Sequence, residues 1–323
     1  MKRRALLFGS LLASASVAAH AQPPAPRRIG FLYPQADLGV AHPVEGELGK
    51  LGYVDGQSAT FIRRFADGKF YRFAALATAL VKADVDIIVA STTSAAVAAK
   101  KVTSTVPIVV LSSGDAVGSG LAQSLARPGG NVTGNSFLGT EFAAKQVQLV
   151  TQLAPKARHI GFMANSRQPP EPIFFGHMQD AAKSLGVSIA FIDTHSPADF
   201  DKSLAQAAAQ KVDALICAPG GYSDWPGDRA ALLAALERRP FVALFFRREF
   251  PEAGGLISHG PNFAAMNRQA ADYVDRILKG ARAGDLPIVQ PTHFDLVINM
   301  KTARRMAITI PPLLLARADS VID

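Results

Sequence analysis

Short apolar runs alternate with helical stretches along most of the chain. The runs lack polar alternation, so both faces of each strand are expected to be covered, as in a parallel sheet. The Ala- and Leu-rich stretches between them, such as 70–81 and 94–101, repeat their apolar positions with the period of a helix. In the first half the predicted strands are residues 28–33, 59–65, 86–90 and 107–111.

The same pattern restarts after a segment rich in Pro and Gly at 127–134. The second set of predicted strands comprises residues 159–164, 187–192, 214–218 and 241–245. A chain of 323 residues, 49% of them hydrophobic, is long enough to form two cores. We therefore predict an α/β protein with two doubly wound parallel-sheet lobes, each a three-layer α/β/α sandwich.

The first 21 residues have the order of a secretory signal peptide. A basic start at residues 2–4 precedes an apolar stretch from Ala5 to about Val17, and Ala19-His20-Ala21 has the small-x-small form of a cleavage site. The apolar stretch is shorter than the ~20 residues that span a bilayer. A buried N-terminal helix is the alternative, but it does not account for this order. We expect export to the periplasm with cleavage after Ala21.

The cysteine content and the charge of the chain exclude several classes of protein. Cys217 is the only cysteine, so the signal of a lipoprotein is lacking and an internal disulfide is excluded. It lies in the apolar run 214–217, which predicts a buried, inert thiol. The formal charge of +8 falls to about +5 (8 − 3) when residues 2–4 leave. The remaining basic residues are scattered except for the Arg pairs at 63–64, 238–239, 247–248 and 304–305, and they form no continuous stripe, which argues against nucleic acid as a partner.

The residues give little support for an enzyme. The histidines are dispersed without the spacing of a zinc site, and the Walker and Gly-x-Ser-x-Gly motifs are missing. The glycines at 114, 118 and 120 follow the wrong strand and have the wrong spacing for a dinucleotide fingerprint. We expect no catalytic residues, no metal and no cofactor.

Ligands of doubly wound sheets bind beyond the carboxyl ends of the strands, which selects candidate residues. Ser91, Thr92 and Thr93 follow the third strand and open a helix, where hydroxyls and free N–H groups suit a carboxylate. Plain N-capping is the alternative for them. Asp115, after the fourth strand, is a candidate for a ligand ammonium group or a helix cap.

The other candidates follow further strands. Asn165 ends the first strand of the second lobe, and residues 219–225 follow its third strand. Aromatic residues at these ends have the size to wall an apolar or aromatic ligand, although each is also a candidate for core packing. The candidates are Tyr33, Asn165, Tyr222, Asp224 and Phe246.

A set of short segments along the chain forms a recognisable pattern. The segments are Leu51-Gly-Tyr-Val-Asp-Gly-Gln57, Val106-Pro-Ile-Val-Val110, Gly114-Asp-Ala-Val-Gly-Ser-Gly-Leu121, Leu125-Ala-Arg-Pro-Gly-Gly-Asn-Val-Thr-Gly134, Arg248-Glu-Phe250, Glu252-Ala-Gly-Gly-Leu-Ile-Ser258, Phe294-Asp-Leu-Val-Ile-Asn299 and Ile310-Pro-Pro312 with Leu315-Ala-Arg-Ala-Asp319. Together they resemble the ABC-transporter substrate-binding family of the tryptophan/tyrosine type. The resemblance runs from about residue 27 to residue 323, in the family's order.

The resemblance implies a type I periplasmic-binding fold whose chain crosses between lobes three times. The crossings would fall near residues 134–139, 259–260 and 287–291. The N-terminal lobe would then comprise residues 28–137 and 260–287, and the C-terminal lobe residues 138–259 and 288–323. Periodicity alone predicts two contiguous domains, so the discontinuous assignment comes from the resemblance.

The resemblance also implies a function. It predicts a monomeric periplasmic component of an ABC importer that binds a small molecule and delivers it to a membrane permease with its ATPase. A sensing subunit for a membrane signalling protein would have the same sequence features. A repressor of the sugar-binding kind would need a helix-turn-helix where the signal peptide lies. The family label favours an aromatic amino acid, while the residues leave the ligand open.

The stretch between Tyr33 and Leu51 is rich in glycine, which disfavours a helix interior. We therefore predict that the first helix is short.

Overall fold

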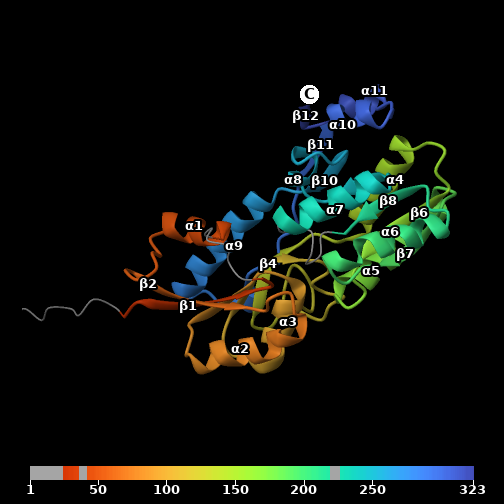
Figure 1. The fold of residues 1–323 in the computed structure, drawn as a ribbon. Helices are drawn as coiled ribbons and strands as arrows, with labels where there is room; N and C mark the ends of the chain where they lie inside the picture. The colour runs from red at the N-terminus through yellow and green to blue at the C-terminus, as the bar shows by residue number, and fades with distance from the viewer. Residues whose placement is uncertain (1–24, 36–41, 219–225) are drawn as a thin grey trace, which may run out of the picture.

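Two sheets of mostly parallel strands form two lobes that lie side by side (Figure 1). The computed structural model describes residues 25–35, 42–218 and 226–323. The predicted signal peptide lies outside these residues. The fold class predicted from the sequence is confirmed, with helices on both faces of each sheet.

The first sheet has five strands in the order β2-β1-β3-β4-β5, all parallel. Their bounds are β1 Arg27–Tyr33, β2 Ala59–Phe65, β3 Ile87–Ala90, β4 Ile108–Ser113 and β5 Val132–Ser136. One face packs against α1 (Pro43–Lys50) and α9 (Phe263–Leu278). The other face packs against α2 (Phe73–Lys82), which a short 3-10 helix (Phe70–Arg72) precedes, and α3 (Thr93–Val102).

The second sheet has seven strands in the order β12-β11-β10-β9-β8-β6-β7. Only the β10–β11 pair is antiparallel among its described pairs. The bounds are β6 His159–Ala164, β7 Ser188–Asp193, β8 Ala214–Cys217, β9 Val242–Phe245, β10 Ile257–Pro261, β11 Phe294–Asn299 and β12 Ser320–Ile322.

Helices cover both faces of the second sheet as well. One face packs against α4 (Thr140–Leu153) and α5 (Pro170–Ser184). The other packs against α6 (Phe200–Ala209) and α7 (Pro226–Arg238). Three short helices complete the lobe: α8 (Glu249–Glu252), α10 (Met300–Arg305) and α11 (Pro312–Leu315).

The chain passes between the two sheets three times. It leaves the first sheet after β5, returns after β10 to form α9, and then crosses back to β11. Figure 1 shows α9, in blue, beside the red and orange elements of the first lobe. A Cβ on Gly260, at the second crossing, would lie 1.7 Å from the carbonyl oxygen of Phe246, so only glycine fits there. The crossings place the strand ends of both lobes around a common cleft.

Candidate ligand-binding cleft

A cavity of about 70 Å³ lies between the two lobes. The ends of β3 and β4 and the loops after them form one wall. The start of α5 and Arg247, which follows β9, form the opposite wall, and the first crossing and the start of α9 complete the lining. The lining residues are Phe70, Ser91, Thr92, Thr93, Ser112, Gly114, Phe137, Leu138, Gln168, Pro170, Glu171, Arg247 and Phe263.

The three hydroxyl residues after β3 line the first-lobe wall, as the strand-end rule predicts. Thr92 Oγ1 accepts a hydrogen bond from Ala95 N at 3.3 Å and so caps α3. Thr93 Oγ1 accepts from Gly114 N at 2.9 Å. Ser91 Oγ donates to the carbonyl oxygen of Leu32 at 3.1 Å. Because Thr92 and Thr93 accept in these bonds, each keeps its O–H group as a donor.

The second-lobe wall carries both signs of charge. Glu171 is only 2% exposed, and Arg247 stacks its guanidinium 3.8 Å above the ring of Phe263. Glu171 and Arg247 each have further partners in the protein. A carboxylate buried this deeply is costly unless a positive or hydrogen-bonding group accompanies it. The wall therefore brings a carboxylate and a guanidinium, each with partners of its own, to the lining of the cavity.

Apolar rings form the rest of the cavity. Phe70 comes from the turn before α2, Phe137 from the first crossing and Phe263 from the start of α9. The rings of Phe137 and Phe263 meet edge to face with centroids 6.0 Å apart. A ligand that entered between the lobes would contact aromatic surface next to the charged groups.

A direct hydrogen bond joins the lobes at the edge of this cavity. Ser94 Oγ in α3 lies 2.5 Å from Gln168 Oε1, which comes from the loop before α5. A second bond between lobes joins Gln35 Nε2 to Asp228 Oδ2 at 3.3 Å. These bonds hold the two walls together in the arrangement that the structure has.

Two first-lobe candidates lie away from the lining. Tyr33 is 1% exposed, donates to Glu45 Oε1 at 3.2 Å and stacks on His42, so its ring packs in the lobe's core. Asp115 Oδ1 accepts from the backbone N–H groups of Val117 and Gly118 at 3.0 and 2.8 Å. In these contacts Asp115 caps the turn that follows β4.

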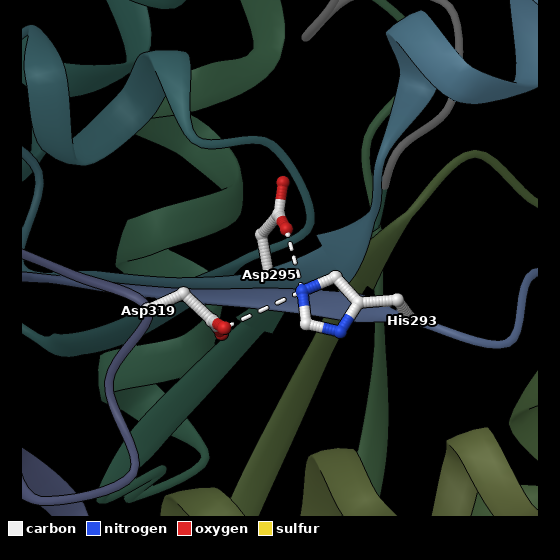
Figure 2. A group of neighbouring side chains, drawn as sticks. All are labelled: His293, Asp295 and Asp319. Atoms are coloured by element: carbon white, nitrogen blue, oxygen red, sulfur yellow. Dashed lines mark ion pairs between the residues drawn. The ribbon is translucent and has the colours of Figure 1, made fainter.

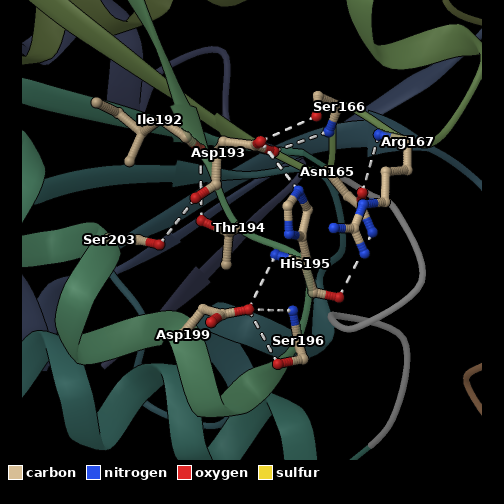
Figure 3. A network of polar contacts seen from close by, with 10 residues as sticks. All are labelled: Asn165, Ser166, Arg167, Ile192, Asp193, Thr194, His195, Ser196, Asp199 and Ser203. Atoms are coloured by element: carbon tan, nitrogen blue, oxygen red, sulfur yellow. Dashed lines mark hydrogen bonds and ion pairs between the residues drawn. The ribbon is translucent and has the colours of Figure 1, made fainter.

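Asn165 belongs to a polar network beyond the ends of β6 and β7 (Figure 3). Its Oδ1 accepts from Arg167 N at 3.0 Å, and its amide reaches the carbonyl oxygen of His195 at 3.5 Å. Asp193 in the same network accepts from Ser166 and pairs with His195 Nε2 at 2.9 Å. Burial acts to raise the pKa of Asp193, but the bonds from Ser166 and the charge of His195 outweigh it and lower the pKa.

Of the remaining second-lobe candidates, the structure describes only Phe246. Phe246 is 2% exposed and packs its ring against Phe142 and Phe174 in the core. Tyr222 and Asp224 lie outside the described residues.

The family follows from comparison with known proteins. A family model described as "ABC transporter substrate binding protein" matches residues 39–322. The chain belongs to this family. Family and fold are those of solute-binding proteins, which are not enzymes. The family implies binding of a small molecule and work with an ABC transporter.

Known relatives of this substrate-binding protein agree. A tyrosine-binding protein of Clostridioides difficile (strain R20291) is 25% identical over 79% of this chain and 72% of its own length. A Streptococcus pneumonia domain solved in complex with L-Trp has a TM-score of 0.82 at 24% identity, covering 92% of this chain and 100% of its own. A ligand-free, open substrate-binding protein from Clostridium difficile has a TM-score of 0.62 at 20% identity, covering 92% and 99%.

One group in the described part of the substrate-binding protein has the donors for a cation (Figure 2). His293 Nε2 lies 3.1 Å from Asp295 Oδ1 and 3.3 Å from Asp319 Oδ1. Protein groups already use both carboxylates, since Asp319 accepts from Leu296 N and Asp295 from Asn262 Nδ2. These contacts fasten the segment before β12 to β11, which is a structural role.

Sequence reasoning missed several lining residues for an identifiable reason. Gln168, Pro170 and Glu171 follow the end of β6 by several residues, so the strand-end rule stops short of them. Arg247 directly follows Phe246, and of this pair the arginine lines the cavity. No helix in the described ranges is long and apolar enough to cross a membrane.

Proposed function

We propose that this substrate-binding protein binds a zwitterionic aromatic amino acid between its lobes and presents it to an ABC importer. One observation carries the proposal: the same cavity combines two hydroxyl donors, a buried carboxylate, a guanidinium and three phenylalanine rings. An α-amino acid with an aromatic side chain has a partner for each of these groups. The printed ligands of the two relatives, tyrosine and L-Trp, support this class.

The ligand carboxylate is assigned to the start of α3. Thr92 and Thr93 hold O–H donors there, and the positive end of a ten-residue helix favours an anion. Arg247 faces the same cavity from the other lobe, so a carboxylate between them would bond to both walls. Such a bridge would stabilise the closed arrangement only when ligand is present.

The ligand ammonium group is assigned to Glu171. This acid lines the cavity and is 2% exposed, whereas Asp115 caps a turn outside the lining. Phe70, Phe137 and Phe263 would then contact the aromatic side chain. Tyr222 and Asp224 remain candidates from the sequence.

Binding would require the lobes to move. A cavity of 70 Å³ is smaller than the 300–1,000 Å³ typical of ligand sites, so the lobes must separate to admit an amino acid. The greater similarity to the L-Trp complex than to the ligand-free, open relative supports a closed arrangement here. We propose that residues 28–137 with 260–287 and residues 138–259 with 288–323 move as the two rigid lobes.

The remaining parts of the proposal concern the cell. We propose that the chain is exported, cleaved after Ala21, and acts as a periplasmic monomer without a lipid anchor. The basic start, the short apolar stretch and Ala19-His20-Ala21 support this.

A ligand panel tests the function. Thermal shift and calorimetry would compare L-tryptophan, L-tyrosine and L-phenylalanine with L-leucine, 3-phenylpropionate and phenethylamine. We expect an aromatic amino acid to bind most tightly, and binding at 100 times Kd should add about 2.7 kcal/mol to stability. Equal binding of 3-phenylpropionate would refute the assigned ammonium site. Uptake of the labelled ligand by cells with and without the gene separates import from sensing.

A further inference from the structure

A second, larger cavity of about 610 Å³ lies where the chain crosses between the lobes. All three crossings contribute to it: Phe137 follows β5, His259 is in β10, and Gln290 and Pro291 precede β11. Phe137 lines both this hinge cavity and the cleft cavity. The lining residues are Phe137, Gly139, Thr140, Glu141, Phe142, Lys145, His259, Gln290, Pro291 and Phe294.

Hydrogen bonds from Gln146 define the tautomer of His259. Gln146 Nε2 lies 3.0 Å from the carbonyl oxygen of His259 and 3.1 Å from its Nδ1. A carbonyl oxygen can only accept, so the amide nitrogen donates in both contacts. Nδ1 is therefore the acceptor, and the hydrogen of the neutral imidazole is on Nε2. Burial, followed by the charge of Lys145, lowers the pKa of His259 to about 4, so the ring is neutral near pH 7.

The Nε2–H group of His259 has no acceptor among the described residues, although the side chain is only 7% exposed. His259 lines the hinge cavity, so a group bound there would be within reach of this donor. This N–H group is open to the cavity, so a bound acceptor could pair with it, as polar groups of a protein interior normally do.

Further groups at the cavity favour an anion. Lys145 lines it, and its ammonium donates to Gln148 Oε1 at 3.1 Å, which leaves it other hydrogens. The first residue of α4 also lines it, and the N-cap, Gly139, has no side chain to cap the helix. Glu141 is the acid in the lining, and it is exposed, so solvent screens its charge.

The remaining walls are aromatic. Phe142 and Phe294 stack with ring centroids 4.7 Å apart, and the imidazole of His259 lies 5.6 and 5.7 Å from them. Apolar rings beside two donors suit a ligand that has an apolar body and one acceptor end. The acid in the lining, Glu141, is exposed, so it would pair only weakly with an ammonium group.

We propose that the hinge cavity is a second ligand site, separate from the cleft, that takes a small aromatic carboxylate. The carboxylate accepts from His259 Nε2–H and pairs with Lys145, and the apolar body contacts Phe142 and Phe294. Because the three crossings supply the walls, a ligand in this site contacts the segments that move when the lobes open.

Benzoate, with benzamide as its neutral counterpart, tests the proposal on the purified chain. We expect benzoate to move the Nε2 resonance of His259 in ¹⁵N-histidine spectra. Lys145→Met should weaken benzoate at least about tenfold, since a charge-assisted hydrogen bond is lost. Lys156→Met removes an exposed lysine outside the lining and should bind benzoate as the wild type does. Benzamide should bind more weakly than benzoate.

His259→Phe keeps an aromatic ring but removes the donor, and it should also weaken benzoate. If that variant does not fold, Lys145→Met and the wild-type resonance still decide the matter. The proposal is overturned if benzoate does not bind at millimolar concentration, if it binds without moving the Nε2 resonance, or if Lys145→Met and Lys156→Met bind it equally. The outcome of this test does not depend on whether the cleft binds an amino acid, so the two proposals can fail separately.

Discussion

Gly114 and Pro170 meet across the cleft so closely that a Cβ on Gly114 would lie 2.3 Å from Pro170 Cβ. Gly114 follows β4 in the first lobe, and Pro170 begins α5 in the second. Real Cβ atoms do not approach this closely, so a side chain at position 114 would force the lobes or the loop apart. The absence of a side chain here permits the arrangement of the lobes that the structure has.

Gly114→Ala should therefore oppose closure. Overpacking costs about 1–3 kcal/mol, so the affinity for the cleft ligand should fall by about fivefold to a hundredfold. Calorimetry would measure the affinity, and small-angle scattering with saturating ligand should show a less compact form. Gly176→Ala is the matched control, because a Cβ there meets nothing within 4 Å. Wild-type affinity and compaction in Gly114→Ala would contradict the closed arrangement.

Thr92→Ala combined with Thr93→Ala should weaken the cleft ligand at least about tenfold, because two O–H donors to a carboxylate are lost. Loss of the Thr92 cap should also reduce stability by about 1 kcal/mol. Calorimetry and chemical denaturation would separate these effects. Thr78→Ala, on the exposed surface of α2, is the control for a lost hydroxyl. If the double variant folds and binds normally, the carboxylate site lies elsewhere.

Glu171→Gln should weaken an aromatic amino acid more than its deaminated analogue. The charge that pairs with the ammonium group is lost, while the shape of the side chain is kept. The ratio of the two affinities is the measurement, because a general distortion of the cleft would weaken both compounds alike. Asp115→Asn serves as the comparison, since Asp115 is the other candidate for this role. A change of ratio in Asp115→Asn alone would assign the ammonium group to Asp115.

The apolar strands were predictable from sequence because parallel strands buried on both faces leave a continuous apolar run. Strand β5 (Val132–Ser136) escaped this rule, although all five of its residues are buried. Its polar side chains are buried because they bond to the backbone: Asn135 Nδ2 reaches Leu111 O and Met266 O, and Ser136 Oγ reaches Gly114 O. The hydropathy of the sequence does not reveal hydrogen bonds between side chains and the backbone, so β5 was not predicted.

The residues of the candidate site also fall into two groups, those that the sequence predicts and those that it does not. Ser91, Thr92 and Thr93 follow a strand directly, so topology alone selected them. Glu171 and Arg247 face the cavity because two lobes meet there, and that contact depends on three crossings that no local pattern encodes. Tyr33 ends β1 and Phe246 follows β9, yet both rings pack in cores, because a position at a strand end does not determine the direction of its side chain.

The free energy of unfolding should decrease in acid, because Asp193 loses its charge there. Its pKa is lower in the folded protein than its usual value near 4, so its contribution is present above that value and is lost as the pH falls through the folded pKa. Asp193→Asn should be less stable than wild type at pH 7, and the difference should shrink below about pH 4. Urea denaturation across this pH range is the measurement. A difference that stays constant with pH would contradict the role of the charge.

Cys217 should report unfolding of the second lobe. It is the only cysteine of the chain, is 2% exposed, and lies in β8 between layers of helices. Burial raises the pKa of its thiol to about 12, so almost no thiolate is present at pH 8. A disulfide reagent such as dithionitrobenzoate should react slowly with the native protein and at once in urea. The cleft ligand should slow labelling further, because it stabilises the folded state.

Two variants serve as controls for the labelling rate. Ser203→Cys combined with Cys217→Ser moves the thiol to another buried position, so it should also react slowly. Ser184→Cys in the same background places the thiol on the surface, so it should react immediately. Fast labelling of native Cys217, at a rate near that of Ser184→Cys, would contradict the packing of this lobe.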